Sequence, residues 1–90
     1  MTGHGVRAAD AVDSARVALR ASGVGEPDLD ADLLVAYALH TDRAGLRMDP
    51  DRQLDADGTK WLRTAVRRRA IEREPLAYIL GTKGFRHLDL

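Results

Sequence analysis

The 90-residue sequence contains no cysteine, which excludes disulfide bonds, thiolate-bound zinc and thiol-based catalysis. It contains no apolar run close to the roughly 20 residues that a membrane-spanning helix needs. The first five residues lack the apolar segment of a secretory signal. We therefore expect a cytoplasmic protein that makes no membrane contact.

The composition that remains is typical of a small helical domain. Hydrophobic residues make up 44% of the chain, too many for an intrinsically disordered segment. The aromatic residues are few: Tyr37, Trp61, Tyr78 and Phe85. Because Leu and Ala have to carry most of the packing and both are strong helix formers, the composition favours one all-α domain.

The charges are unevenly distributed, although the net charge is zero. Residues 1–58 contain 6 basic and 11 acidic residues, whereas residues 59–90 contain 8 basic and 3 acidic residues. Arginine accounts for 12 of the 14 basic residues, and its rigid guanidinium suits paired contacts with carboxylates or phosphates. The division indicates either attraction between two parts of the chain or a basic face for a partner.

Apolar spacing predicts a small bundle of about five helices. Ala8, Val12, Ala15 and Leu19 recur at spacings of three and four, which describes one face of a helix. Gly23 follows this helix at the position where a left-handed cap is needed. The predicted helices cover residues 7–22, 27–39, 43–48, 56–73 and 76–80.

The starts of the later helices carry residues typical of helix N-termini. Pro27 and Pro75 fit the first position of the second and fifth helices. Asp42 and Asp55 can cap the third and fourth helices. The expected inward faces are Leu29, Leu33, Ala36 and Tyr37, widened by Leu34 and Ala38, on the second helix, and Trp61, Leu62, Ala65, Val66 and Arg69 on the fourth.

The last residues of the chain differ in character from the helices. Residues 83–90 contain Phe85, Leu88 and Leu90 with little helical period, and they predict the start of an extended strand. A strand without a partner leads us to expect that the natural chain continues. The expected organisation is a flexible N-terminus over residues 1–6, a helical domain over residues 7–81, and an extended segment over residues 82–90, which the family resemblance described below identifies as the start of an interdomain β-hairpin.

No pattern in the chain has the spacing of a catalytic, cofactor or metal site. The Gly-x-Gly at residues 23–25 follows a helix rather than a strand and lacks the third glycine of a dinucleotide fingerprint. The three aspartates of residues 28–32 imitate an EF-hand loop, but Leu33 and Leu39 stand where that loop needs Gly and Glu. We therefore assign no catalytic, cofactor-binding or metal-binding residue, and expect no catalysis by this chain alone.

The arginine run at residues 67–69 is the most distinctive electrostatic feature. On the predicted fourth helix Arg63 and Arg67 point outward and suit an acidic partner or RNA phosphates. Arg69 and Arg73 fall near the apolar face, from which they could bridge to the acidic second helix. The candidate partner-binding residues are Arg63, Arg67 and Arg68, although a solvated helix face with arginine stems over apolar surface also explains them.

The segment of residues 74–81 reads Glu-Pro-Leu-Ala-Tyr-Ile-Leu-Gly and is followed by Phe85 and Leu88. It resembles the Glu-Pro-Leu-x-Tyr-Ile-x-Gly segment, with a Phe four residues after the Gly, of the release-factor glutamine methyltransferases (the HemK family). Residues 23–34 are similar to the family's Gly-Val and Leu-Asp-Ala-Glu-Leu-Leu stretches. His40 and His87 depart from the family, which usually has Gly at both positions.

The motif residues are interpreted as structural, because they join domains rather than do chemistry. They are Glu74, Pro75, Tyr78, Gly81 and Phe85. Pro75 starts a helical turn and Gly81 lets the chain reverse direction. Tyr78 is expected to offer a buried ring whose hydroxyl needs a partner.

The resemblance implies a helical domain that a β-hairpin joins to a Rossmann-like methyltransferase domain. That second domain binds S-adenosylmethionine and methylates the Gln of the Gly-Gly-Gln motif in class-1 peptide chain release factors. This chain contains neither the family's catalytic Asn-Pro-Pro-Tyr motif nor its cofactor loop, so no such residue is carried over. The implied role is to hold and orient the release factor, and we expect a monomer.

Two other functions stay open at the level of the sequence. One is a free-standing helical adaptor that binds an acidic protein. The other is a small nucleic-acid-binding domain that uses Arg63, Arg67 and Arg68, which a zero net charge makes the weaker alternative.

Overall fold

The computed structural model describes residues 5–81. Its elements are β1 (Val6–Arg7), α1 (Ala8–Ala21), α2 (Pro27–Ala38), α3 (Arg43–Met48), β2 (Gln53–Leu54), α4 (Ala56–Ala70) and α5 (Leu76–Gly81). The predicted all-α class is confirmed over this range. The strand predicted for residues 83–90, including Phe85, lies outside the described residues.

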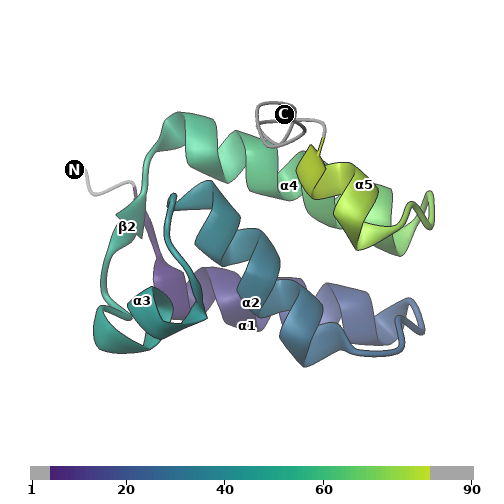
Figure 1. Ribbon diagram of the computed structural model, residues 1–90, viewed down its shortest axis with the longest axis horizontal. Coiled ribbons are helices and arrows are strands. Elements are labelled where there is room, and N and C mark those ends of the chain that lie inside the picture. Colours follow the sequence, from purple (N-terminus) through teal and green to yellow (C-terminus); the bar gives the residue numbers. More distant parts are fainter. Residues whose placement is uncertain (1–4, 82–90) are drawn as a thin grey trace, which may run out of the picture.

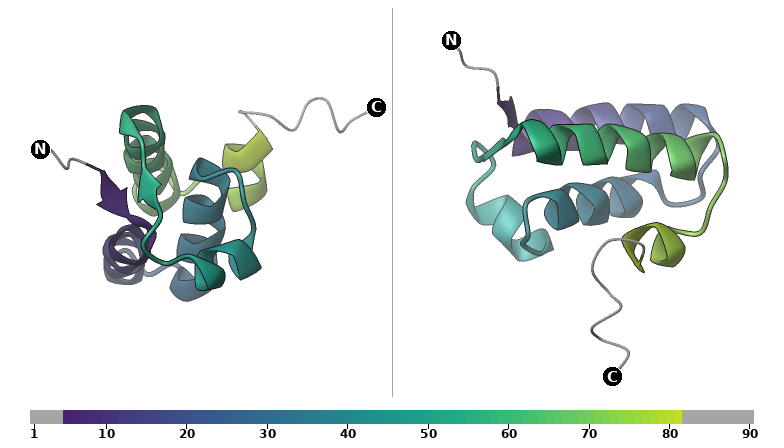
Figure 2. Two further views of the ribbon diagram at one scale, coloured as in Figure 1. Left: turned by 90° about the vertical axis from the view of Figure 1, so that its left-hand side faces the viewer. Right: turned by 90° about the horizontal axis from the view of Figure 1, so that it is seen from above.

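Three long helices form the body of the molecule (Figure 1). Seen end-on, α1, α2 and α4 occupy the corners of a triangle, and α5 lies beside α2 and α4 (Figure 2). The short helix α3 packs against α2 at the end of the molecule away from α5 (Figure 1). This arrangement leaves one side of α4 next to α1 and the other side next to α2 and α5.

The predicted helix ends agree closely with the structure. Gly23 has a φ of 81°, and its N–H donates to Arg20 O at 3.1 Å, which closes α1 in a left-handed cap. Pro27 occupies the first turn of α2. Asp42 accepts from Gly45 N at 2.9 Å and Asp55 accepts from Gly58 N at 2.6 Å, so both act as the predicted N-caps.

A two-stranded antiparallel sheet was not predicted from the sequence. In it Val6 pairs with Leu54 and Arg7 pairs with Gln53. Two backbone bonds continue the pairing into α1, because Ala8 N donates to Arg52 O at 2.7 Å and Ala9 N to Pro50 O at 3.0 Å. The segment between α3 and β2 thus satisfies the first amides of α1, a helix whose N-cap residue makes no side-chain capping bond.

The sheet also bears on the N-terminus that was expected to be flexible over residues 1–6. The structure describes Gly5 and Val6 of that segment, and Val6 lies in β1. Two-residue strands are too short to show the alternating pattern that predicts a strand, which explains why the sequence did not reveal them.

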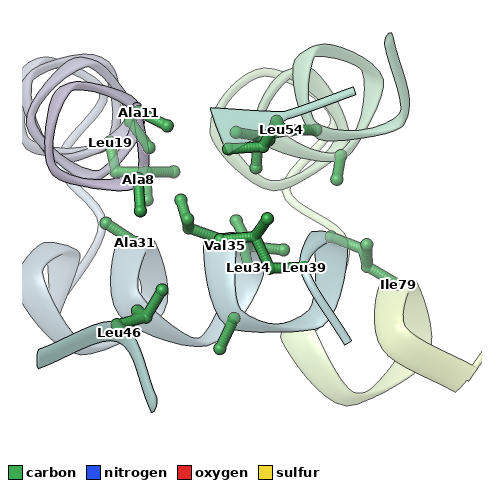
Figure 3. Close-up of a cluster of buried hydrophobic side chains, with 14 of the residues drawn as sticks. Ala8, Ala11, Leu19, Ala31, Leu34, Val35, Leu39, Leu46, Leu54 and Ile79 are labelled. Atoms are coloured by element: carbon green, nitrogen blue, oxygen red, sulfur yellow. The ribbon is translucent and has the colours of Figure 1, made fainter. Parts of the chain in front are cut away.

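The core lies between the three long helices and is rich in alanine (Figure 3). The largest fully buried side chains are Leu19, Leu34, Val35, Leu54 and Ile79. Within residues 5–81, no helix combines the length and the hydropathy needed to cross a bilayer.

The predicted inward face of α2 was partly wrong. Ala36 and Leu34 are buried, but Leu29, Leu33, Tyr37 and Ala38 are only half-buried. Ala31 and Val35, which were not included, are buried completely. The reason is that α2 contacts α1, α3, α4 and α5, so it is covered on several faces and has no single apolar stripe.

The predicted fourth helix extends too far at its C-terminus. The structure ends α4 at Ala70, and Arg73 takes a left-handed backbone conformation with a φ of 60°. The inward face of α4 agrees with the prediction: Leu62 and Ala65 are buried, and Trp61, Val66 and Arg69 are half-buried. The early end lets the chain fold back toward α2 through α5.

Candidate partner-binding surface

The end of α4 and the start of α5 are joined by a network of arginine side chains. Arg68 donates from Nη2 to Glu74 Oε1 at 2.7 Å and from Nε to the same oxygen at 3.1 Å. This bond lowers the pKa of Glu74 and raises the pKa of Arg68. The Arg68 guanidinium also lies 5.9 Å from the centre of the Tyr78 ring, within cation–π range.

Arg69 ties the same turn to α2. Its Nε donates to Asp30 Oδ2 at 2.9 Å, and its Nη1 donates to Glu74 O at 3.1 Å. Asp30 is only 6% exposed and is a buried charged residue. A buried carboxylate needs a charged or hydrogen-bonding partner, so Arg69 is required by the fold. The predicted bridge from the inward arginines to the acidic second helix is confirmed for Arg69.

The same prediction was wrong for Arg73. Its Nη1 donates to Ser22 O at 2.6 Å, at the C-terminal end of α1, rather than to a carboxylate of α2. Carbonyl oxygens at a helix C-terminus lack partners within the helix and attract cations. Arg73 therefore fastens the α4–α5 turn to α1.

The motif of residues 74–81 forms α5 and the residue pair before it. Pro75 directly precedes the helix, and its carbonyl accepts from Tyr78 N at 3.0 Å and Ile79 N at 3.1 Å. The expectation of a buried Tyr78 ring was wrong, because Tyr78 is 62% exposed and packs against Arg68. Ile79 takes the buried position instead, one residue further around the helix. Gly81 is the last residue of α5, and Phe85 lies beyond the described residues.

The outer face of α4 presents a different group of cations, which we call the basic ridge: Lys60, Arg63 and Arg67. Spacings of three and four residues place them on one stripe of the helix, and all three are exposed. Over residues 5–81, none of the three forms a salt bridge or a side-chain hydrogen bond. The structure therefore separates Arg63 and Arg67, which are free, from Arg68, which is engaged with Glu74 and Tyr78.

Most other arginines of the described residues are paired. They are Arg7 with Asp10 and Asp51, Arg16 with Asp13 and Asp28, Arg20 with Asp28, and Arg43 with Asp32, while Arg52 donates to Leu39 O. In the described part of the chain Arg47, on α3, is a further exposed arginine without such a partner. Most arginine side chains of the described residues therefore form contacts within the domain. On α4, the residues of the basic ridge do not.

The Gly-x-Gly at residues 23–25 serves as the cap and turn after α1, and it does not follow a strand. Among residues 5–81, no three His, Asp or Glu side chains converge in a way that could hold a metal ion.

Comparison with known families decides the relationship of the chain. Residues 10–81 match the model of the family described as the PrmC N-terminal domain. The chain belongs to this family. The matched range contains α1 almost entirely and extends to the last residue of α5. The resemblance to release-factor glutamine methyltransferases is confirmed.

Several curated relatives of this PrmC N-terminal domain are named release factor glutamine methyltransferase. The chain is 45% identical to the one from Coxiella burnetii over 64 residues, which are 71% of this chain and 23% of that protein. It is 41% identical to the one from Geobacter sulfurreducens over 78 residues, which are 87% of this chain and 27% of that protein. The chain thus spans about a quarter of the length of these relatives. No solved structure matches it significantly.

The structure shows the backbone at His40, one of the positions at which the family resemblance predicts Gly. His40 has a φ of 59° and follows Leu39, the C-cap residue of α2. This left-handed conformation favours Gly because it brings the Cβ of other residues close to the backbone. The sequence signalled this position through the resemblance, whereas nothing in it signalled the left-handed Arg73.

Proposed function

We propose that this domain helps to hold a class-1 peptide chain release factor while its glutamine is methylated. In this proposal the acceptor is the Gln of the Gly-Gly-Gln motif and the methyl donor is S-adenosylmethionine, which binds outside residues 5–81. The support is the membership of the PrmC N-terminal domain family and its similarity to proteins named release factor glutamine methyltransferase. The domain would contribute by positioning the substrate, which lowers the entropic part of the reaction barrier.

The observation that carries the proposal is the basic ridge. Its three cations are exposed on α4, and within the described residues no carboxylate pairs with them. Charges in such positions steer an oppositely charged partner toward the surface and fix its orientation. The ridge therefore fits an acidic region of a protein substrate.

The test compares two charge reversals in the affinity of this chain for a purified class-1 release factor. We expect Arg63→Glu together with Arg67→Glu to weaken binding by about tenfold, mainly through slower association that depends on salt. Arg47→Glu serves as the control, because Arg47 is equally exposed but lies on α3, away from the ridge. Circular dichroism of both variants should show unchanged helix content.

Each outcome has a distinct meaning. Equal affinity of the ridge variant and the parent chain would remove Arg63 and Arg67 from the proposal. Absence of any release-factor binding by the parent chain would contradict the proposed function itself. RNA binding with a steep dependence on salt would instead favour the nucleic-acid alternative.

A further inference from the structure

A groove lies between α1 and α4. These two helices lie on the side of the molecule away from α5 (Figure 2). Its volume is about 290 Å³, and its lining is mainly apolar. Ala11 and Ala15 of α1, Leu62 of α4 and Leu54 of β2 belong to the buried core and form its floor. On the α1 side the groove is lined by Ala11 and Ala15, whose short side chains leave space between α1 and α4.

The size and shape of this groove favour one class of occupant. Its volume is at the lower end of the roughly 300–1,000 Å³ that pockets enclosing a small-molecule ligand have, and it is open to solvent. A shallow apolar hollow of this kind suits apolar side chains that project from a partner, which is how interfaces place their central anchors.

The two edges of the groove differ in charge. Arg63 lines it from α4, and Arg67 continues the same edge one turn further along the helix. On α1, Ser14 lines the groove and is exposed. The acidic residue before it, Asp13, is already paired with Arg16. Uncompensated charge therefore occurs on the α4 edge only, and it is positive.

We propose that the α1–α4 groove is the docking site for an amphipathic segment of the protein substrate. Such a segment inserts apolar side chains over Ala11 and Ala15 and places carboxylates beside Arg63 and Arg67. The inference rests on the proposed function, since it assigns this segment to the release factor. It goes further by adding an apolar anchor site to the charged ridge and by naming Ser14 as a residue of the interface.

Nucleic acid is the less favourable occupant of the same surface. Its phosphates would meet Arg63 and Arg67 on one edge, but the apolar floor of the groove has no polar side chain to bind them. Bases would have to stack on aromatic rings for strong single-strand binding, and the groove lining contains none.

The test fills the groove without altering the core. Ser14→Phe adds a ring over the groove from an exposed position, so the domain is expected to fold normally. Thr64→Phe is the matched control, because Thr64 is also exposed and neutral but lies on the stripe of Trp61 and Arg68, on the other side of α4. We expect Ser14→Phe to weaken release-factor binding at least about tenfold and Thr64→Phe to leave it within about twofold.

A second measurement reads the groove directly. When unlabelled release factor is added to the methyl-labelled chain, the NMR signals of the Ala11 and Ala15 methyl groups should shift. Binding that leaves these signals and the Ser14→Phe affinity unchanged would overturn the groove proposal while the proposed function stands. A parent chain that binds no release factor would contradict both. A third outcome combines weaker release-factor binding by Ser14→Phe with self-association of the parent chain in sedimentation. It would assign the groove to a second copy of the chain and overturn the proposal.

Discussion

The arginines at the end of α4 and those on its outer face come from one stretch of sequence, yet their surroundings are opposite. Arg68 and Arg69 both reach Glu74, and Arg69 also holds the buried Asp30. Arg63 and Arg67 have no such partner within residues 5–81 and lie exposed beside the groove. A basic run is therefore not one functional unit: its members at the turn hold the fold together, and those on the outer face are free to bind a partner.

The largest expected effect tests the structural half of this comparison. Arg69→Met removes the partner of a carboxylate that is only 6% exposed. An uncompensated buried charge is strongly unfavourable, so we expect the free energy of unfolding to fall by about 3 kcal/mol. Arg67→Met is the matched control and should change it by less than about 0.5 kcal/mol. Urea unfolding followed by circular dichroism measures both values.

A double variant separates lost charge pairing from lost packing. Asp30→Leu combined with Arg69→Met replaces the pair by apolar side chains, and such replacements are often neutral or stabilising. We expect the double variant to recover most of the stability that Arg69→Met loses. A double variant as unstable as Arg69→Met alone would show that the bond from Arg69 to Glu74 O, rather than the pair with Asp30, makes Arg69 structural.

The next effect is smaller and concerns His40 and Arg73, the two non-glycine residues of the described chain with a left-handed backbone. His40→Gly relieves an unfavourable backbone conformation and should stabilise the domain by about 0.5–1 kcal/mol. Arg73→Gly relieves the same kind of conformation but loses the bond to Ser22 O, so we expect no gain. Thermal unfolding measures the pair. An equal gain in stability in both variants would mean that the bond from Arg73 to Ser22 O does not stabilise the turn. Arg73 would then not count among the arginines that hold the fold together.

Features of the domain that depend on interactions between residues close in the sequence could be predicted from the sequence. Helix ends depend on neighbours within four residues, so Gly23, Asp42 and Asp55 could be assigned from the sequence alone. The outward direction of Arg63 and Arg67 followed from helical periodicity in the same way. These features required no knowledge of how the helices pack.

Features that depend on distant segments were not predictable in this way. Asp30 and Arg69 are 39 positions apart, so the bridge could be anticipated only as attraction between an acidic and a basic helix. The exposure of Tyr78 depends on which side of α5 faces α2, and a six-residue helix has too few apolar positions to decide it. The groove could not be predicted either, because the space between α1 and α4 results from their packing.

The smallest expected effect concerns the pH dependence of the turn. The bond from Arg68 lowers the pKa of Glu74 in the folded domain. In the unfolded chain the carboxyl titrates near its ordinary value of about 4.3. A lowered folded pKa means that the pair stabilises the domain fully above that value, and that this stabilisation is lost as the pH falls through the folded pKa. The effect is modest because both side chains remain partly in contact with solvent.

Glu74→Gln should therefore lower the thermal midpoint at pH 7, and the difference from the parent domain should shrink as the pH falls from about 5 to about 3. Glu72→Gln is the control, since Glu72 is exposed and lies in the same turn. The Glu72→Gln variant should keep most of the pH dependence of the parent domain's thermal midpoint. The reason is that the Arg68 bond is the main cause of the lowered Glu74 pKa, and the contact with Glu72 is a smaller cause. If the Glu74→Gln difference stays constant across this pH range, the Arg68–Glu74 bond does not hold the turn in solution. Arg68 would then no longer count among the arginines that hold the turn through Glu74, and the division of the arginine run would move by one residue.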